Sequence, residues 1–248
     1  MIKNNKDVKG MMVNFHHVVK DKYLSIAPDL WWGDDLDVRF FLLRHLVKIK
    51  NKKILDIGCN VGISISFLDK SNDLYGIDNN EFCVNKARKL NNTAYINKGS
   101  MEFLPYDDKS FDVVVMMNTF PYYDFPVMDG EKHDFIHRTF DEIYRVLRDD
   151  GVLYLTTPNG ESIYFSNKKI KLHELTTALA NFDYDLKGWN WFKPFYLFNN
   201  FKFYLNHPKI MCRLEFVWRR LVNDMLCKNI IDVSRAKYFY LEARKIQK

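Results

Sequence analysis

A short turn near residue 60 is the first stretch of this chain whose residue types and spacing could do chemistry. The segment ILDIGCNVG, residues 54–62, reads as a buried strand that runs into a turn with glycines at Gly58 and Gly62. Nucleotide-binding turns usually carry a third glycine between these two, and here Asn60 stands in its place. Asparagine tolerates the left-handed backbone region better than most residues. We therefore expect Asn60 to hold the turn, while Gly58 and Gly62 let a ligand approach the backbone.

An acidic residue follows at the spacing that a nucleotide site needs. Asp78 ends the predicted strand LYGID, 22 positions after Asp56. A carboxylate about 20 positions along, at the tip of the second strand, is placed to accept hydrogen bonds from ribose hydroxyls. The alternative is that Asp78, Asn79 and Asn80 simply cap the next helix. The turn and the carboxylate together favour a ligand site.

Alternating strands and helices must position these residues. Apolar runs predict strands at 52–58, 74–78, 93–99, 111–118, 151–159 and 236–245, and a further strand that ends at residue 189. Helical spacing predicts helices at 35–50, from 63, at 81–91, at 133–151 and from 173, the fourth of them stopped by Gly151. This alternation predicts βαβ units and a parallel sheet, which binds ligands beyond the carboxyl ends of its strands.

Composition limits the class of protein. The chain has 248 residues, 47% of them hydrophobic, enough for one sizeable core. Its four cysteines form no CxxC pair, which favours free thiols in a reducing compartment. The N-terminus is polar, and no run of about 18 apolar residues occurs, so we expect a cytoplasmic protein without a transmembrane helix.

Charge is unevenly distributed along the chain. Of 37 Lys and Arg and 31 Asp and Glu, residues 160–248 hold 16 and 8, which leaves 21 and 23 in residues 1–159. The basic C-terminal part suits an acidic partner, such as a phosphorylated substrate, an anionic membrane surface or nucleic acid. A solvated basic face is the alternative.

Four stretches together resemble a known family. ILDIGCNVG, LYGIDNN, GSMEFLPYDDKSFDVVVMMNTF and EIYRVLRDDGVLYLTTPN are similar, in this order, to the motifs of class I S-adenosylmethionine-dependent methyltransferases, closest to their small-molecule branch. The chain also loosely resembles methyltransferases of glycan pathways. The resemblance covers about residues 52–160. It implies a Rossmann-like α/β fold with a seven-stranded, mostly parallel sheet, helices on both faces and an antiparallel last strand. It also implies S-adenosyl-L-methionine as cofactor and S-adenosyl-L-homocysteine as product.

The same resemblance assigns the cofactor-binding residues. Asp56 matches the family's contact to the methionine amino group, Asp78 the ribose contact, and Asn79 the residue beside the adenine. Ser100 stands where the family more often has an aspartate that binds the adenine amino group. The implied set is Asp56, Gly58, Asn60, Gly62, Asp78, Asn79, Ser100, Met101, Met117 and Asn118.

The segment after the fourth predicted strand supplies the candidates for catalysis. Tyr122, Tyr123 and Asp124 lie where the family often has a histidine. A tyrosine of ordinary pKa is a poor base at neutral pH, but it can orient a hydroxyl, and Asp124 becomes a base if burial raises its pKa. Loop packing is the alternative. His133 and His137 share a helical face without an evident third ligand, so we predict no metal site.

Both ends of the chain are candidates for binding the methyl acceptor. We divide the chain into lid helices at 1–50, a core at 51–189, an aromatic and basic insert at 190–234 and a final core strand at 235–248. Aromatics interleaved with Lys and Arg can stack on sugars or bases, bind phosphate or lie at a membrane interface. The predicted acceptor residues are Tyr23, Trp32, Trp189, Trp191, Arg219 and Arg220. The alternative is that these aromatic residues only pack against the core and bind no acceptor.

These observations lead to one expected function and one alternative. We expect methylation of a small or lipid-linked acceptor, with O-methylation of a hydroxyl compound such as a sugar as the leading interpretation. The alternative is methylation of RNA or protein docked on the basic C-terminal part. The sequence has no recognisable RNA-binding domain, and the fourth strand is followed by MNTF and not by the NPPY motif of amino-methylating enzymes, so nucleic acid is not the expected partner. A non-enzymatic cofactor-binding module is a third interpretation. Peripheral membrane contact and oligomeric state stay open.

Overall fold

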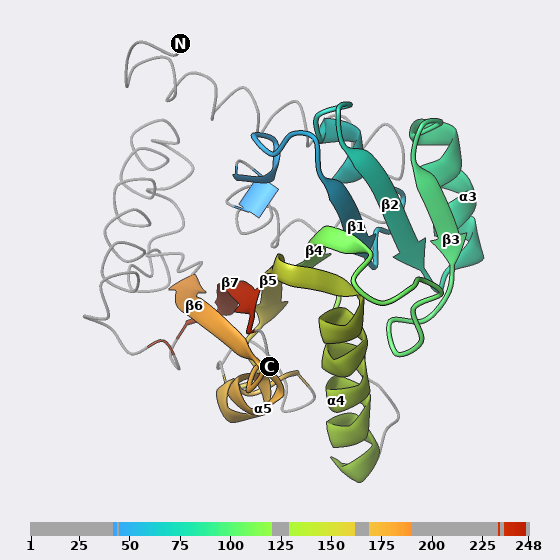
Figure 1. Ribbon diagram of the computed structural model, residues 1–248. Helices are drawn as coiled ribbons and strands as arrows, with labels where there is room; N and C mark the ends of the chain where they lie inside the picture. Colours follow the sequence, from blue (N-terminus) through green and yellow to red (C-terminus); the bar gives the residue numbers. More distant parts are fainter. Residues whose placement is uncertain are drawn as a thin grey trace, which may run out of the picture.

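One seven-stranded sheet organises the part of the chain that the computed structural model describes, residues 42–43, 45–120, 129–161, 169–189, 233 and 236–246 (Figure 1). Its order across the sheet is β3-β2-β1-β4-β5-β7-β6. The strands are β1 (Lys53–Ile57), β2 (Asp73–Asp78), β3 (Tyr95–Lys98), β4 (Phe111–Met117), β5 (Leu147–Pro158), β6 (Phe182–Trp189) and β7 (Tyr238–Lys245).

Strand direction confirms the predicted sheet. β1 to β5 pair in parallel, whereas β7 is antiparallel to both of its neighbours, β5 and β6. The carboxyl ends of all strands except β7 therefore meet at one edge. The strand order reverses between β1 and β4, and such a switch point is where an open α/β sheet binds its ligand.

Buried apolar residues cover both faces of the sheet, as expected for parallel strands. Along β4, Val114 and Met116 belong to one core cluster, and Val113, Val115 and Met117 belong to the other. Side chains alternate between the two faces of a strand, so the two clusters lie on opposite faces. The sheet is thus a central layer with an apolar core on each side.

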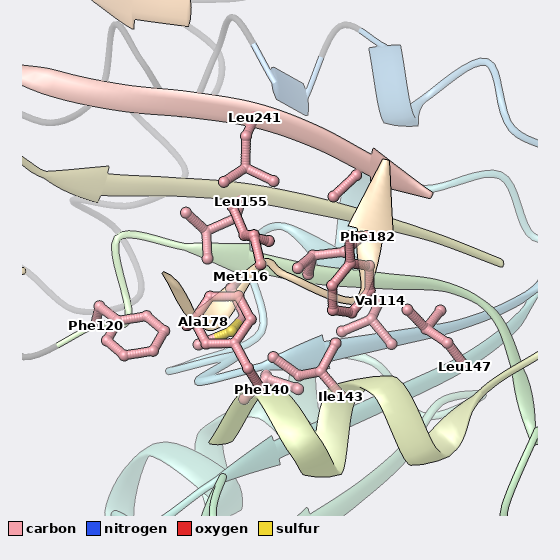
Figure 2. Close-up of a cluster of buried hydrophobic side chains, with 14 of the residues drawn as sticks. Val114, Met116, Phe120, Phe140, Ile143, Leu147, Leu155, Ala178, Phe182 and Leu241 are labelled. Carbon is pink, nitrogen blue, oxygen red and sulfur yellow. The ribbon is translucent and has the colours of Figure 1, made fainter. Parts of the chain in front are cut away.

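Helices cover these faces. α4 (Asp129–Val146) and α5 (Leu172–Ala178) pack on the face of Val114 and Met116, and Figure 2 shows Phe140 and Ile143 of α4 directed at that cluster. α3 (Glu81–Leu90) and the helical residues 42–43 and 45–46 contribute to the cluster on the other face. The predicted helix over 35–50 is described only from residue 42 and without residue 44. Among the described residues, no helix is both long and apolar enough to span a membrane.

The predicted helix after the turn is mostly wrong. Residues 63–70 form only η2 (Ile65–Phe67), a single turn of 3-10 helix. Two β-branched isoleucines alternate here with two serines, both poor helix formers. The hydroxyl of Ser66 donates to the carbonyl oxygen of Ile63 at 2.6 Å, a local bond that competes with an α-helix.

The helix stop predicted at Gly151 is also wrong. α4 ends at Val146, and the residue with a left-handed backbone is Asp150, at φ 64°. The register of β4 on β5 shifts between the pairs Phe111–Leu147 and Val113–Val152, so residues 148–151 bulge from the ladder. Glycine at 151 is explained by crowding, because an added Cβ would lie 2.8 Å from the carbonyl oxygen of Arg148.

Candidate functional site

The turn after β1 has the backbone that the sequence predicts. Gly58, Asn60 and Gly62 all have left-handed conformations, with φ of 69°, 50° and 76°. The side-chain Oδ1 of Asn60 accepts a hydrogen bond from the backbone nitrogen of Val61 at 2.6 Å. Asparagine can form this local bond and glycine cannot, which explains how Asn60 replaces the missing glycine.

Packing inside the protein explains both glycines. A Cβ added to Gly58 would lie 2.0 Å from Cγ2 of Thr119, and one added to Gly62 would lie 2.5 Å from Nδ2 of Asn91. Asn91 Nδ2 also donates to the carbonyl oxygen of Gly62 at 2.9 Å, which ties the turn to the end of α3. The expected room beside these two glycines is therefore partly filled by the protein's own side chains.

Asp78 joins the tips of two strands. Its Oδ2 accepts from the backbone nitrogen of Asn60 at 2.9 Å, and its Oδ1 accepts from that of Asn80 at 2.9 Å. The cap of α3 is Asn80, whose Oδ1 accepts from the backbone nitrogens of Phe82 and Cys83. The capping alternative is therefore correct for Asn80, and Asp78 accepts from the backbone of that cap residue while its other oxygen bonds the turn after β1. Each carboxylate oxygen can accept a second hydrogen bond, so Asp78 keeps capacity for a ligand's hydroxyls.

A second carboxylate lies inside the sheet below the turn. Asp56 is buried in β1, between Gly76 of β2 and Val115 of β4. Cys59 in the turn is buried as well, and burial, followed by the charges of Asp56 and Asp78, raises the pKa of its thiol far above the ordinary value. Cys59 is therefore a neutral packing residue and not a nucleophile.

The segment after β3 begins beside Asp78. The backbone nitrogen of Gly99 donates to the carbonyl oxygen of Asp78 at 3.0 Å, which brings Ser100 to the β2 side of the site. Ser100 Oγ accepts from the backbone nitrogen of Glu102 at 3.3 Å, and the partly buried Met101 packs against the core. Asn79 is exposed at the tip of β2. These placements agree with an adenine-binding region at the ends of β2 and β3, and the individual contacts to adenine stay predictions.

Side chains of helix α4 hold residues 102–108, which follow β3 and Ser100. The sequence did not predict this role of α4. Glu142 accepts from the backbone nitrogen of Leu104 at 2.7 Å. Arg145 donates to the carbonyl oxygens of Leu104 and Tyr106, at 2.9 and 2.7 Å, and forms ion pairs with Glu142 and Asp108. The side chains of one helix face thus determine where the segment from 102 to 108 lies.

The end of β4 carries an unusual polar residue. Asn118 is 4% exposed and has a left-handed backbone, with φ 53°. Both of its side-chain polar atoms, Oδ1 and Nδ2, are buried without a hydrogen-bond partner. Met117 next to it approaches the turn after β1, with 4.0 Å between its Sδ and Oγ of Ser64. Unsatisfied buried amides are rare in proteins, so Asn118 stays a candidate for contact with a polar ligand.

Several predicted residues lie outside the described parts of the chain. They are Tyr23, Trp32, Tyr122, Tyr123, Asp124, Trp191, Arg219 and Arg220. Trp189 is the last residue of β6, where it pairs with Tyr238 in β7. His133 and His137 stack at 4.2 Å between ring centroids, and no group of three or more His, Cys, Asp or Glu that could hold a metal occurs among the described residues.

Comparison with known proteins agrees with this geometry. Residues 55–155 match a family described as "Methyltransferase domain". A probable S-adenosylmethionine-dependent methyltransferase of Mycolicibacterium smegmatis is 28% identical over 66% of this chain and 63% of its own. A sterol 24-C-methyltransferase of Debaryomyces hansenii is 24% identical over 60% of this chain and 42% of its own. The chain thus spans less than two thirds of the length of these relatives.

A solved structure shows the same fold. A possible histamine N-methyltransferase from Thermotoga maritima aligns with a TM-score of 0.52 at 16% identity, over 95% of this chain and 100% of its own. The matched methyltransferase domain over residues 55–155, the strand order and this likeness of fold support a class I S-adenosylmethionine-dependent methyltransferase. The cofactor of this class is S-adenosyl-L-methionine.

The residues present fit that cofactor. A left-handed turn after β1, a carboxylate at the tip of β2 and an unpartnered amide at the end of β4 follow one another along a single sheet edge. Ribose hydroxyls need acceptors such as the Asp78 carboxylate, and the polar methionine end needs both donors and acceptors. The chemistry of these residues therefore suits both the ribose and the methionine part of S-adenosyl-L-methionine, in the order expected along the sheet edge.

Proposed function

We propose that this protein transfers a methyl group from S-adenosyl-L-methionine to a small or lipid-linked acceptor, by O-methylation of a hydroxyl compound such as a sugar. The observation that carries the cofactor part is the bond from the Asn60 amide to the Asp78 carboxylate, which joins the turn after β1 to the tip of β2. That pair holds a carboxylate at the tip of β2, one strand from the switch point between β1 and β4, where the ribose would bind.

The residues at this sheet edge are proposed to bind different parts of the cofactor. Asp78 would hold the ribose, and Ser100 and Met101, which directly precede the segment held by α4, would receive the adenine. Met117 and Asn118 would border the methyl donor. When bound, the cofactor supplies a sulfonium methyl group, which is transferred as the carbon–sulfur bond breaks and sulfur keeps the electron pair. The protein's main contribution is then alignment, because holding two reactants in line lowers the barrier by itself.

Tyr122, Tyr123 and Asp124 are proposed to orient or deprotonate the acceptor, because they follow the Asn118 end of β4 directly. The acceptor itself is proposed to contact Tyr23, Trp32, Trp189, Trp191, Arg219 and Arg220. The excess of Lys and Arg after residue 160 supports an acceptor that carries phosphate or carboxylate. The alternative, RNA or protein as acceptor, would use the same charge.

Methyl transfer from tritiated S-adenosylmethionine tests the function. The acceptors are monosaccharides, sugar phosphates, glycine, a sterol and total RNA, with calorimetry of S-adenosylhomocysteine alongside. We expect binding of the product and transfer to a hydroxyl acceptor. Failure of the purified chain to bind either cofactor form would contradict the proposal. Transfer to RNA alone, weakened steeply by salt, would favour the alternative.

A further inference from the structure

Asn91, the residue that directly follows α3, connects this helix to the turn after β1. It is 8% exposed, and its Nδ2 donates to two backbone carbonyl oxygens. One belongs to Ala87 in the last turn of α3, at 3.2 Å, and the other belongs to Gly62, at 2.9 Å. An amide nitrogen has two hydrogens, so both bonds can form together, and the bond within the helix fixes the direction of the bond to the turn.

Neither carbonyl oxygen depends on the Asn91 side chain for a hydrogen bond. The carbonyl oxygen of Gly62 also accepts from the backbone nitrogen of Ser66 at 3.2 Å, and that of Ala87 accepts from the backbone nitrogen of Asn91 at 2.9 Å. Loss of the side-chain amide would therefore leave both carbonyls paired, and an unpaired buried group is what makes a lost hydrogen bond most costly. What the amide adds is chiefly a fixed position of Gly62 relative to α3.

A second side chain holds the same turn at the other end of α3. Asp78 accepts from the backbone nitrogen of Asn60 and from that of Asn80, the residue that caps α3. The helix packs along β2 and β3 (Figure 1). Residues 60–62 are thus tied to both ends of one packed helix, through Asp78 before it and through Asn91 after it.

The backbone of the turn needs to be held in this way. Gly58, Asn60 and Gly62 all have left-handed conformations, each separated from the next by one residue. Glycine adopts many backbone conformations with similar ease, and sparsely populated conformations persist only where the surrounding structure determines them. The bond from Asn91 therefore favours one conformation at Gly62 over the others that a glycine could adopt.

We propose that Asn91 is a positioning residue for S-adenosyl-L-methionine, which sets cofactor affinity through the carbonyl group of Gly62 and does not itself touch the ligand. This rests on the proposed binding of the cofactor at the turn after β1. Without the amide, the turn of the free protein would populate further conformations. The fraction of molecules ready to bind would fall, and the apparent affinity would fall by the same factor.

Asn91→Leu tests this role, because leucine has the branched shape of asparagine without its polar atoms. Asn72→Leu is the matched control. Asn72 is 7% exposed, and its Nδ2 also donates to two backbone carbonyl oxygens, those of Ile49 at 2.8 Å and Asp69 at 3.0 Å. It directly precedes β2, so it lies at the end of that strand opposite to Asp78.

Calorimetry with S-adenosylhomocysteine and thermal unfolding without ligand provide the two readouts. We expect Asn91→Leu to lower affinity about tenfold, the factor of one ordinary hydrogen bond. Asn72→Leu should bind within about twofold of the parent, because distant sites act independently, even if its unfolding temperature falls further than that of Asn91→Leu. Asn91→Ala, which adds no bulk beside Gly62, replaces Asn91→Leu if that variant does not fold.

A double variant shows whether Asn91 acts through the backbone of the turn. Asn60→Gly gives that backbone more freedom and should by itself change affinity only a few-fold. Combined with Asn91→Leu, it should lower affinity by more than the product of the two single effects, because both changes loosen the same three residues. Combined with Asn72→Leu, the two effects should simply multiply.

Three results would overturn the inference while leaving the proposed function intact. They are parental affinity in a folded Asn91→Leu or Asn91→Ala variant, equal losses of affinity in Asn91→Leu and Asn72→Leu, and simple multiplication of effects in the variant with both Asn60→Gly and Asn91→Leu. Absence of S-adenosylhomocysteine binding by the parent would instead contradict the proposed function itself.

Discussion

The carboxylate of Asp78 accepts a hydrogen bond from the backbone amide of Asn60, with 2.9 Å between nitrogen and Oδ2. This bond makes Asp78 part of the turn as well as a candidate ligand for the cofactor. Loss of the side chain therefore removes an acceptor for the ribose and a tether for the turn at the same time.

Replacement of Asp78 by alanine should weaken binding of S-adenosylhomocysteine by about 1–3 kcal/mol, the range for leaving polar groups unpaired. Isothermal calorimetry measures the change directly. Asp73→Ala is the control, because Asp73 is exposed at the opposite end of the same strand. Full affinity in Asp78→Ala would exclude Asp78 from the site.

Substitutions of Asn60 should separate backbone conformation from side-chain chemistry. Asn60→Gly should keep cofactor affinity within a few-fold, because glycine adopts φ near 50° without strain. Asn60→Val should lose most affinity, because a β-branched residue is strongly disfavoured there. Equal tolerance of both variants, measured by the same calorimetry, would show that the turn needs no special backbone.

Acidification should release the segment that Glu142 holds. The hydrogen bond from Arg145, with that from the Leu104 amide, lowers the pKa of Glu142 below its ordinary value of 4.5. A carboxyl with a lowered folded-state pKa stabilises the protein above its unfolded-state pKa and loses that contribution as pH falls through the folded-state pKa. Stability should therefore decline below about pH 4.5.

The Glu142→Gln variant isolates this effect. It should unfold at lower temperature than the parent at about pH 7, and the difference should shrink as the pH falls below the ordinary value of 4.5. Asp141→Asn, an exposed site on the same helix, serves as control. A difference between parent and Glu142→Gln that stays constant with pH would rule out this role of the Glu142 carboxylate.

The insert at 190–234 and Trp189, which precedes it at the end of β6, should affect the acceptor more than the cofactor. Alanine at Trp189, Trp191, Arg219 or Arg220 should raise the acceptor KM or abolish transfer, and S-adenosylhomocysteine affinity should stay near that of the parent. Steady-state kinetics with calorimetry provide both values. Parallel loss of cofactor affinity in folded variants would refute the division between a cofactor core and an acceptor insert, whereas no effect on either would indicate a packing cap.

Sequence reasoning succeeded where the signal is local. The left-handed turn at Asn60 and the carboxylate at the tip of β2 follow from residue type, spacing and strand pattern. The strands themselves are short apolar runs that a parallel sheet buries on both faces.

It failed where the determining contact is distant or where two local signals compete. Gly151 is a usual helix stop, yet Asp150 takes the left-handed conformation and Gly151 relieves a contact with Arg148. The hydroxyl of Thr156, which is buried without a hydrogen-bond partner, lies where β5 pairs with both β4 and β7. No sequence pattern reports which hydroxyl among TTPN will lack a partner once three strands have paired.

The position of β7 has a consequence for how the chain folds. β7 follows β6 along the chain, but it lies between β5 and β6 in the sheet. During synthesis, β1 to β5 can pair as they emerge, while β6 has no sheet neighbour until residues 238–245 have been made. For that interval β6 and the flank of β5 remain open edges, which are prone to pair with other chains. The sheet is thus complete, and its open edges are covered, only after β7 has inserted between β5 and β6.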